Sequence, residues 1–269
     1  MQSRPIILSF ASFLSLFAFS LPILVLADDP VPPVNSRPDR TIPGGPRFHP
    51  PRRGAPSRRS GDGTRGAETT PPVDDKPTRT VTAGPRDECL LDKKPLAALI
   101  PENLVGLTTA QSPTWFFYIP QSSAKEAEFT LRDEKNEQIY KTTLRIPSKS
   151  GVISFSIPDL STSSALEVGK NYRWNLALIC SSQDESKVKA IGGYIQIIQP
   201  SADLVAKLKK AKTMRDRINI YAQAGIWYDT IATLAKLRRD NPNDADLAKD
   251  WASLLKQIGL NEIAEEPLL

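Results

Sequence analysis

The chain has 269 residues, 40% of them hydrophobic, and a formal net charge of +5 at pH 7. This charge is too small to indicate a nucleic-acid binder, and two cysteines with one histidine do not complete a tetrahedral zinc site. The sequence contains no nucleophile elbow, zinc-protease motif, phosphate-binding loop or EF-hand loop. We therefore predict no catalytic, cofactor-binding or metal-binding residues.

The first 27 residues have the features of a secretory signal peptide. Arg4 precedes an apolar stretch from Ile6 to Leu26, and Ala27 follows as a small residue at the expected cleavage position. We predict cleavage after Ala27, no membrane span in the mature chain, and a periplasmic or extracellular location. An uncleaved anchor is the alternative, because the apolar stretch approaches the length of a bilayer span.

Residues 28–88 differ in composition from the rest of the chain. They hold 13 of the 24 prolines and few large apolar residues, which predicts a disordered tether. Between residues 46 and 66, one acidic residue accompanies six arginines: Arg47, Arg52, Arg53, Arg58, Arg59 and Arg65. This tract is either a solvated linker or a contact for an anionic envelope polymer or headgroup surface. Nucleic acid suits it less, because aromatic side chains are not interleaved with the arginines.

The two cysteines, Cys89 and Cys180, are 91 positions apart. An even number of cysteines in an exported protein predicts a disulfide bond, which would stabilise the fold by about 4 to 5 kcal/mol. A catalytic thiol would need a base beside it, and the only histidine, His49, lies in the predicted tether.

Residues 89–200 alternate between apolar and polar side chains in short runs, separated by turns such as residues 133–137. This pattern predicts an antiparallel β-sandwich of the immunoglobulin or fibronectin type. The predicted strands are Thr114–Ile119, Ala127–Arg132, Gln138–Ile146, Val152–Ile157, Asn171–Cys180 and Val188–Ile198.

The fifth of these runs predicts a core strand, because its alternation places five large side chains on one face. Before it, Leu166, Gly169 and Tyr172 have the spacing of a tyrosine corner, in which the phenol bonds to upstream backbone. Gly192 and Gly193 predict a bulge or turn at the start of the next strand. The five inward residues are Tyr172, Trp174, Leu176, Leu178 and Cys180.

Four consecutive aromatic residues, Trp115, Phe116, Phe117 and Tyr118, lie in one predicted strand. Alternation sends Trp115 and Phe117 to one face and Phe116 and Tyr118 to the other. One sheet interior therefore cannot bury all four. The remaining pair is either covered by the C-terminal segment or exposed as a surface for a partner protein.

Residues 201–269 change to the helical period. We predict a first helix from Ser201 to a break at Gly225, a helix start at Asn241-Pro242, and a left-handed end at Gly259. Residues 225–242 resemble the second half of one tetratricopeptide repeat. A segment this small is not stable alone, so it should dock on the sandwich and bury Trp227 or Trp251, giving one folded unit over residues 89–266.

Several stretches in the same order resemble the cyanobacterial proteins grouped as domain of unknown function 928. The likeness covers about residues 89–269 and implies an exported protein of a photosynthetic bacterium with a β domain and a helical tail. It implies no activity and no catalytic residues. The stretches are PLAALIPENLVGLTTAQSPTWFFYIP (95–120), LEVGKNYRWNLALIC (166–180), GIWYDTIATLAKLR (225–238) and DWASLLKQIGLNEIAEEPL (250–268).

The sequence therefore favours an exported, non-enzymatic interaction or scaffold module of the cell envelope. Its partner would be another envelope protein or an anionic envelope polymer. The alternative hypothesis is an envelope hydrolase whose active site follows no familiar motif.

Export with removal of residues 1–27 makes a direct prediction. N-terminal sequencing of the native product from an envelope fraction should give the sequence that starts Asp28-Asp29. Intact chains starting at Met1 in the cytosol would contradict it.

Overall fold

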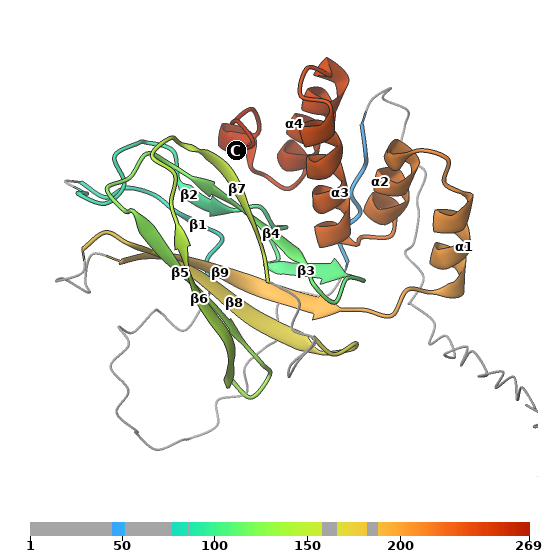
Figure 1. Ribbon diagram of the computed structural model, residues 1–269, viewed down its shortest axis with the longest axis horizontal. Coiled ribbons are helices and arrows are strands. Elements are labelled where there is room, and N and C mark those ends of the chain that lie inside the picture. Colours follow the sequence, from blue (N-terminus) through green and yellow to red (C-terminus); the bar gives the residue numbers. More distant parts are fainter. Residues whose placement is uncertain (1–44, 52–76, 86, 158–165, 182–187) are drawn as a thin grey trace, which may run out of the picture.

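The computed structural model describes residues 45–51, 77–85, 87–157, 166–181 and 188–269 (Figure 1). The predicted signal peptide lies outside this part of the chain. The described residues form an α+β fold that is mainly β, with two sheets followed in sequence by four α-helices. The helices lie together at one side of the sheets (Figure 1).

One sheet has four strands in the order β1-β2-β4-β7, and the other has five in the order β3-β9-β8-β5-β6. Neighbouring strands are antiparallel, except that β3 and β9 are parallel. The strands are β1 (Thr80–Val81), β2 (Leu96–Ala98), β3 (Val105–Thr108), β4 (Thr114–Ile119), β5 (Glu126–Arg132), β6 (Gln138–Arg145), β7 (Gly151–Ser156), β8 (Asn171–Ile179) and β9 (Val188–Ile197).

All six predicted strands are present, as β4 to β9, and their ends lie within one residue of the prediction. The short strands β1, β2 and β3 were not predicted. Every residue of β2 is buried, so its sequence shows no alternation. β1 pairs with β2 although it lies inside the predicted tether, so the ordered part of the chain begins before Cys89.

The aromatic strand β4 divides its side chains between two cores, as alternation predicts. On one face, the Trp115 ring lies 5.0 Å from Phe129 and the Phe117 ring 5.6 Å from Trp174, between the two sheets. On the other face, Phe116 lies toward the helices. The four-stranded sheet is therefore the middle layer of the molecule.

The predicted tyrosine corner is confirmed in its hydrogen bond, because the Glu167 backbone N–H donates to the Tyr172 hydroxyl at 2.8 Å. The prediction for the glycine pair is wrong. Gly192 and Gly193 lie inside β9 in regular register with β8. A Cβ on Gly193 would lie 2.9 Å from the Trp174 ring, so this glycine allows the indole to pack flat on its neighbouring strand.

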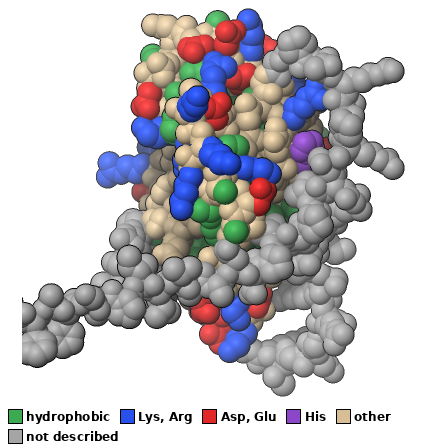
Figure 2. Space-filling model, turned by 90° about the vertical axis from the view of Figure 1, so that its right-hand side faces the viewer, with side chains coloured by type: hydrophobic (Ala, Val, Ile, Leu, Met, Phe, Trp, Pro, Cys, Tyr) green, Lys and Arg blue, Asp and Glu red, His purple; other side chains and the backbone are tan. Residues whose placement is uncertain are grey.

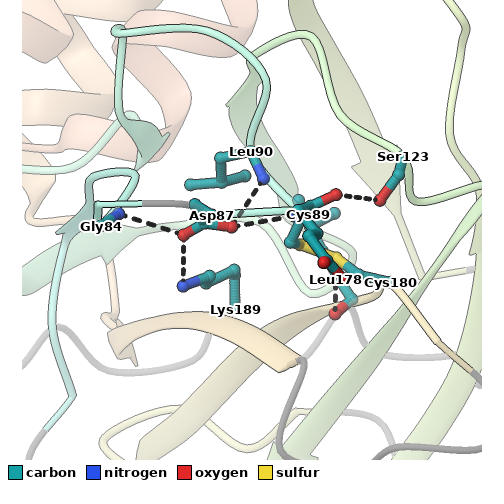
Figure 3. The surroundings of a disulfide bond; sticks show 9 residues. Gly84, Asp87, Cys89, Leu90, Ser123, Leu178, Cys180 and Lys189 are labelled. Atoms are coloured by element: carbon teal, nitrogen blue, oxygen red, sulfur yellow. Dashed lines mark hydrogen bonds and ion pairs between the residues drawn. A yellow bond between two sulfur atoms is a disulfide. The ribbon is translucent and has the colours of Figure 1, made fainter.

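Cys89 and Cys180 form the predicted disulfide bond, with their Cα atoms 5.3 Å apart (Figure 3). Beside it, the Asp87 carboxylate accepts the N–H groups of Cys89 and Leu90 at 2.8 and 3.0 Å and pairs with Lys189 at 2.6 Å (Figure 3). Burial opposes ionisation of Asp87, but the Lys189 ammonium and the backbone N–H groups outweigh it and lower the pKa of this carboxyl. The disulfide thus ties the N-terminal edge of the sandwich to the end of β8.

The C-terminal segment contains four α-helices and a short 3-10 helix. The single helix predicted up to Gly225 is wrong, because Thr213 divides it. Thr213 Oγ1 accepts the Asp216 N–H at 3.0 Å and the Asp216 carboxylate accepts the Thr213 N–H at 2.8 Å, which is a capping box. The helices are α1 (Ala202–Lys210), α2 (Met214–Gln223), α3 (Trp227–Asp240), α4 (Ala245–Gln257) and η1 (Asn261–Ile263).

Two other helix boundaries test the prediction. Gly225 and Gly259 have φ of +73° and +75°. Both lie just after a helix end in the left-handed conformation that favours glycine, so the helix ends predicted at these two residues are confirmed. The start predicted at Asn241-Pro242 is wrong, because Asp244 caps α4 by accepting the N–H groups of its first turn.

The helices dock on the sheets through the start of α3. The Trp227 indole N–H donates to the Leu99 carbonyl at 2.7 Å, and the Trp174 indole N–H donates to the Tyr228 hydroxyl at 2.9 Å. Trp227 and Trp251 are 0% and 1% exposed, which confirms the predicted docking. Tyr228 therefore joins the core between the two sheets.

Asp229 adds a polar link between α3 and β3. Its carboxylate accepts the Thr108 hydroxyl at 2.7 Å and the Thr109 hydroxyl and N–H at 2.5 and 3.1 Å. Burial raises the pKa of Asp229, and the three donors only partly oppose this shift.

Replacing Asp229 tests this link. Asp229→Ala leaves the threonine donors without an acceptor and should lower the free energy of unfolding by about 1 to 3 kcal/mol. Asp229→Asn keeps one acceptor oxygen and should lower the free energy of unfolding by less. Because the pKa of Asp229 is raised in the folded state, the native chain should gain stability relative to Asp229→Asn as pH falls through that pKa. Urea unfolding at several pH values measures both effects, and equal stability of all three chains would contradict the role of Asp229.

Candidate peptide-binding groove

An extended N-terminal segment, residues 45–51, lies along the helices next to α2 and α3 (Figure 1). Its backbone is bound by one side chain of α4. The Phe48 N–H donates to Gln257 Oε1 at 2.9 Å, and Gln257 Nε2 donates to the Pro46 carbonyl at 3.0 Å. The side-chain amide of Gln257 therefore binds both a backbone donor and a backbone acceptor of the segment, as in the recognition of extended peptides.

The end of α2 provides the next contact. The His49 N–H donates to the Ala222 carbonyl at 3.1 Å, and this carbonyl also accepts the Gly225 N–H at 3.1 Å at the end of the helix. A Cβ on Gly225 would lie 2.6 Å from the His49 carbonyl oxygen. Gly225 therefore serves both the left-handed turn after α2 and the close approach of the segment.

Phe48 anchors the segment in the core. Its side chain is 7% exposed, and its ring meets the Trp227 ring edge to face with centroids 4.7 Å apart. Burying a phenylalanine side chain contributes about 1.5 to 3 kcal/mol. Trp227 is held by its bond to Leu99, so the receiving surface for this anchor is rigid.

The other end of the groove carries charge. Gly45 has φ of +62°, and a Cβ there would lie 3.1 Å from the Asp250 carboxylate. Burial raises the pKa of Asp250, and Arg215, at 2.8 Å, opposes this shift. A peptide in this groove therefore passes a partly buried acidic side chain at its N-terminal end.

The groove places part of the predicted tether on the folded domain. His49 and Arg47 lie among the described residues, whereas Arg52, Arg53, Arg58, Arg59 and Arg65 lie outside them. Lys and Arg side chains also gather on the side of the molecule formed by α1 and α2 (Figure 2). Lys207, Lys209 and Lys210 are in the last turn of α1, where positive charge stabilises a helix end.

The predicted aromatic partner surface requires a correction. Trp115, Phe116, Phe117 and Tyr118 are at most 3% exposed. The Phe116 ring lies 6.1 Å from Trp251 of α4, so the helices cover the face that alternation sends away from the sheet interior. These residues are core, and they offer no surface to a partner.

Sequence reasoning did not find the groove, although one signal for it exists. Phe48 is the only aromatic residue in the proline-rich stretch from 28 to 88. A lone aromatic side chain there indicates an anchor, but the residues that receive it lie more than 170 positions away in sequence. Gln257, which binds the Phe48 backbone, is 209 positions from it.

Within the residues that the structure describes, no helix is both long and apolar enough to cross a membrane. The same residues contain no group of three or more His, Cys, Asp or Glu side chains that would suit a metal ion.

No curated protein matches the chain. The model of the family described as Domain of Unknown Function (DUF928) matches residues 80–268, so the match includes β1 and all four helices but begins after the segment at 45–51. The chain therefore belongs to the DUF928 family.

Proposed function

We propose that this protein is an exported, non-enzymatic interaction module of the cell envelope whose helices bind an extended peptide. One observation carries the proposal: residues 45–51 are held by two backbone bonds to Gln257, one to the end of α2, and a buried phenylalanine. Backbone bonds provide general affinity for an extended chain, and an aromatic anchor provides selectivity. The ligand class is therefore a short extended peptide with a central aromatic residue and flanking prolines.

The segment at 45–51 acts as an internal ligand in this proposal. It belongs to the same chain as the groove, so its effective concentration is on the order of mM, as for other tethered ligands. A partner peptide must displace it, and binding is then controlled by the difference between the two affinities. Release of the segment would free the Phe48 site for a partner in the envelope.

Two features support the envelope setting. Residues 1–27 have a signal-peptide pattern, and the Cys89–Cys180 bond suits an oxidising compartment. We also propose that the α2–α3 hairpin is a single tetratricopeptide-like unit and that the sandwich is immunoglobulin-like. A hydrolase is less well supported, because the buried carboxylate of Asp229 is already occupied by three donors.

A peptide-binding experiment tests the proposal. A fluorescein-labelled peptide of residues 44–53 is titrated with the mature chain and with its Phe48→Ala variant, and anisotropy is recorded. Phe48→Ala weakens the internal ligand, so this variant should bind the peptide at least about tenfold more tightly than the native chain does. The same peptide with alanine in place of phenylalanine should not bind.

Two controls keep the result interpretable. Leu91→Ala changes a 57% exposed apolar side chain away from the groove and should behave like the native chain. Circular dichroism establishes that Phe48→Ala is folded. If the folded variant fails to bind the peptide, or binds the alanine peptide equally well, the helices are not a peptide receptor.

A further inference from the structure

The outer face of the five-stranded sheet carries an unusual charge pair. β8 lies between β5 and β9, with Trp174 and its alternate neighbours turned toward the core. On the opposite face, Arg132 of β5 is directly opposite Arg173 of β8, and Arg173 is directly opposite Tyr194 of β9. Two guanidinium groups and a phenol therefore start from adjacent positions in one row across the sheet.

This arrangement has no structural explanation within the fold. Like charges directly opposite each other destabilise a sheet. Among the described residues, neither arginine forms a salt bridge with a carboxylate. Within the part of the chain that the structure describes, Arg132 donates to the Asn136 carbonyl at 3.1 Å, and the Nε of Arg173 is shielded from solvent without an acceptor.

The acidic side chains near this row, Glu134 and Glu128, bind partners other than the two arginines. Glu134 accepts the backbone and side-chain N–H groups of Asn171 at 3.1 and 3.0 Å. These two bonds lower the pKa of Glu134. Glu128 lies four residues along β5 from Arg132, about 13 Å at strand rise, and pairs with Lys141 at 2.8 Å. The arginine pair therefore has donor capacity that none of the described residues uses.

The surrounding positions of this face are neutral and suited to hydrogen bonding. Thr130, Asn175 and Gly192 form the adjacent row, and Asn171 opposite Gln196 forms the row on the other side. A Cβ on Gly192 would lie 2.3 Å from Asn175 Oδ1 and 3.3 Å from Pro77, so these two residues fill the space over this glycine and the Asn175 amide lies close to the strand. Amides and hydroxyls recognise sugar hydroxyls, and a phenol ring can stack on a sugar ring.

We propose that the face centred on Arg132, Arg173 and Tyr194 binds a carboxylate-bearing polysaccharide. Guanidinium forks match carboxylates in paired hydrogen bonds, and cross-strand neighbours about 5 Å apart are close enough to share one acidic group. A row of side chains that runs across neighbouring strands suits an extended polymer better than a compact ligand. This site is separate from the helical groove, and its arginines are not those of the tract at 47–65.

The experiment is affinity electrophoresis of the full mature chain in gels that contain polygalacturonate. The chains compared are native, Arg132→Gln, Arg173→Gln, the double variant, and Arg145→Gln, which removes the same charge from an exposed position of β6 on the same sheet. The double variant should bind at least about tenfold more weakly than the native chain, and Arg145→Gln should remain within about twofold of it. The arginine tract at 47–65 is present in every chain compared, so its contribution to the retardation in the gel is the same for all of them.

Two further measurements separate the alternatives. Removing like-charge repulsion should leave the double variant at least as stable as the native chain in urea, whereas a clear loss of stability would make the arginines structural and overturn the proposal. Gels with polyglutamate and with neutral dextran should show weaker retardation than polygalacturonate. Equal retardation by polyglutamate, or an equal loss with Arg145→Gln, would show a general charge effect and also overturn it.

Discussion

The fold depends on two adjacent aromatic residues at the start of α3. Trp227 donates its indole N–H to Leu99 beside the four-stranded sheet, and Tyr228 accepts the indole N–H of Trp174 from the five-stranded sheet. Each bond satisfies a polar group that burial would otherwise leave without a partner, so the two rings can enter the core at little cost. A Cβ on Gly106 of β3 would lie 2.3 Å from the Tyr228 ring, which shows how closely the helix start is fitted to the sheet.

This fitted junction places the candidate functions at the surface. The aromatic side chains of β4 are used to join the two sheets to each other and the four-stranded sheet to the helices, so they offer no partner surface. Trp227 also supplies the surface on which Phe48 rests, and the groove for residues 45–51 is thus a consequence of the same junction. The arginine row of the five-stranded sheet lies on the face turned away from it and is an independent feature.

Sequence patterns predict the parts of this fold whose signal is local. β8 was predictable because one face is buried and the other is half exposed, and the left-handed glycines ending α2 and α4 follow from local sterics. β2 was not, because burial on both faces removes alternation. The residues of the capping box, Thr213 and Asp216, have the expected spacing in the sequence. The apolar residues on both sides keep one helical period, however, so the pattern predicts a continuous helix there. The position of residues 45–51 follows from contacts with Trp227 and Gln257, which a proline-rich local composition does not encode.

The central claim is that the Trp227–Tyr228 junction makes the sandwich and the helices one cooperative unit. Native-state hydrogen exchange of the disulfide-bonded chain in increasing urea tests it most directly. The account predicts that core amides of α3 and α4, such as Ile231 and Leu254, exchange through the same global opening as Phe117 and Leu176, with free energies equal within about 1 kcal/mol. Exchange of the helices through a separate opening, several kcal/mol below that of the strands, would contradict it.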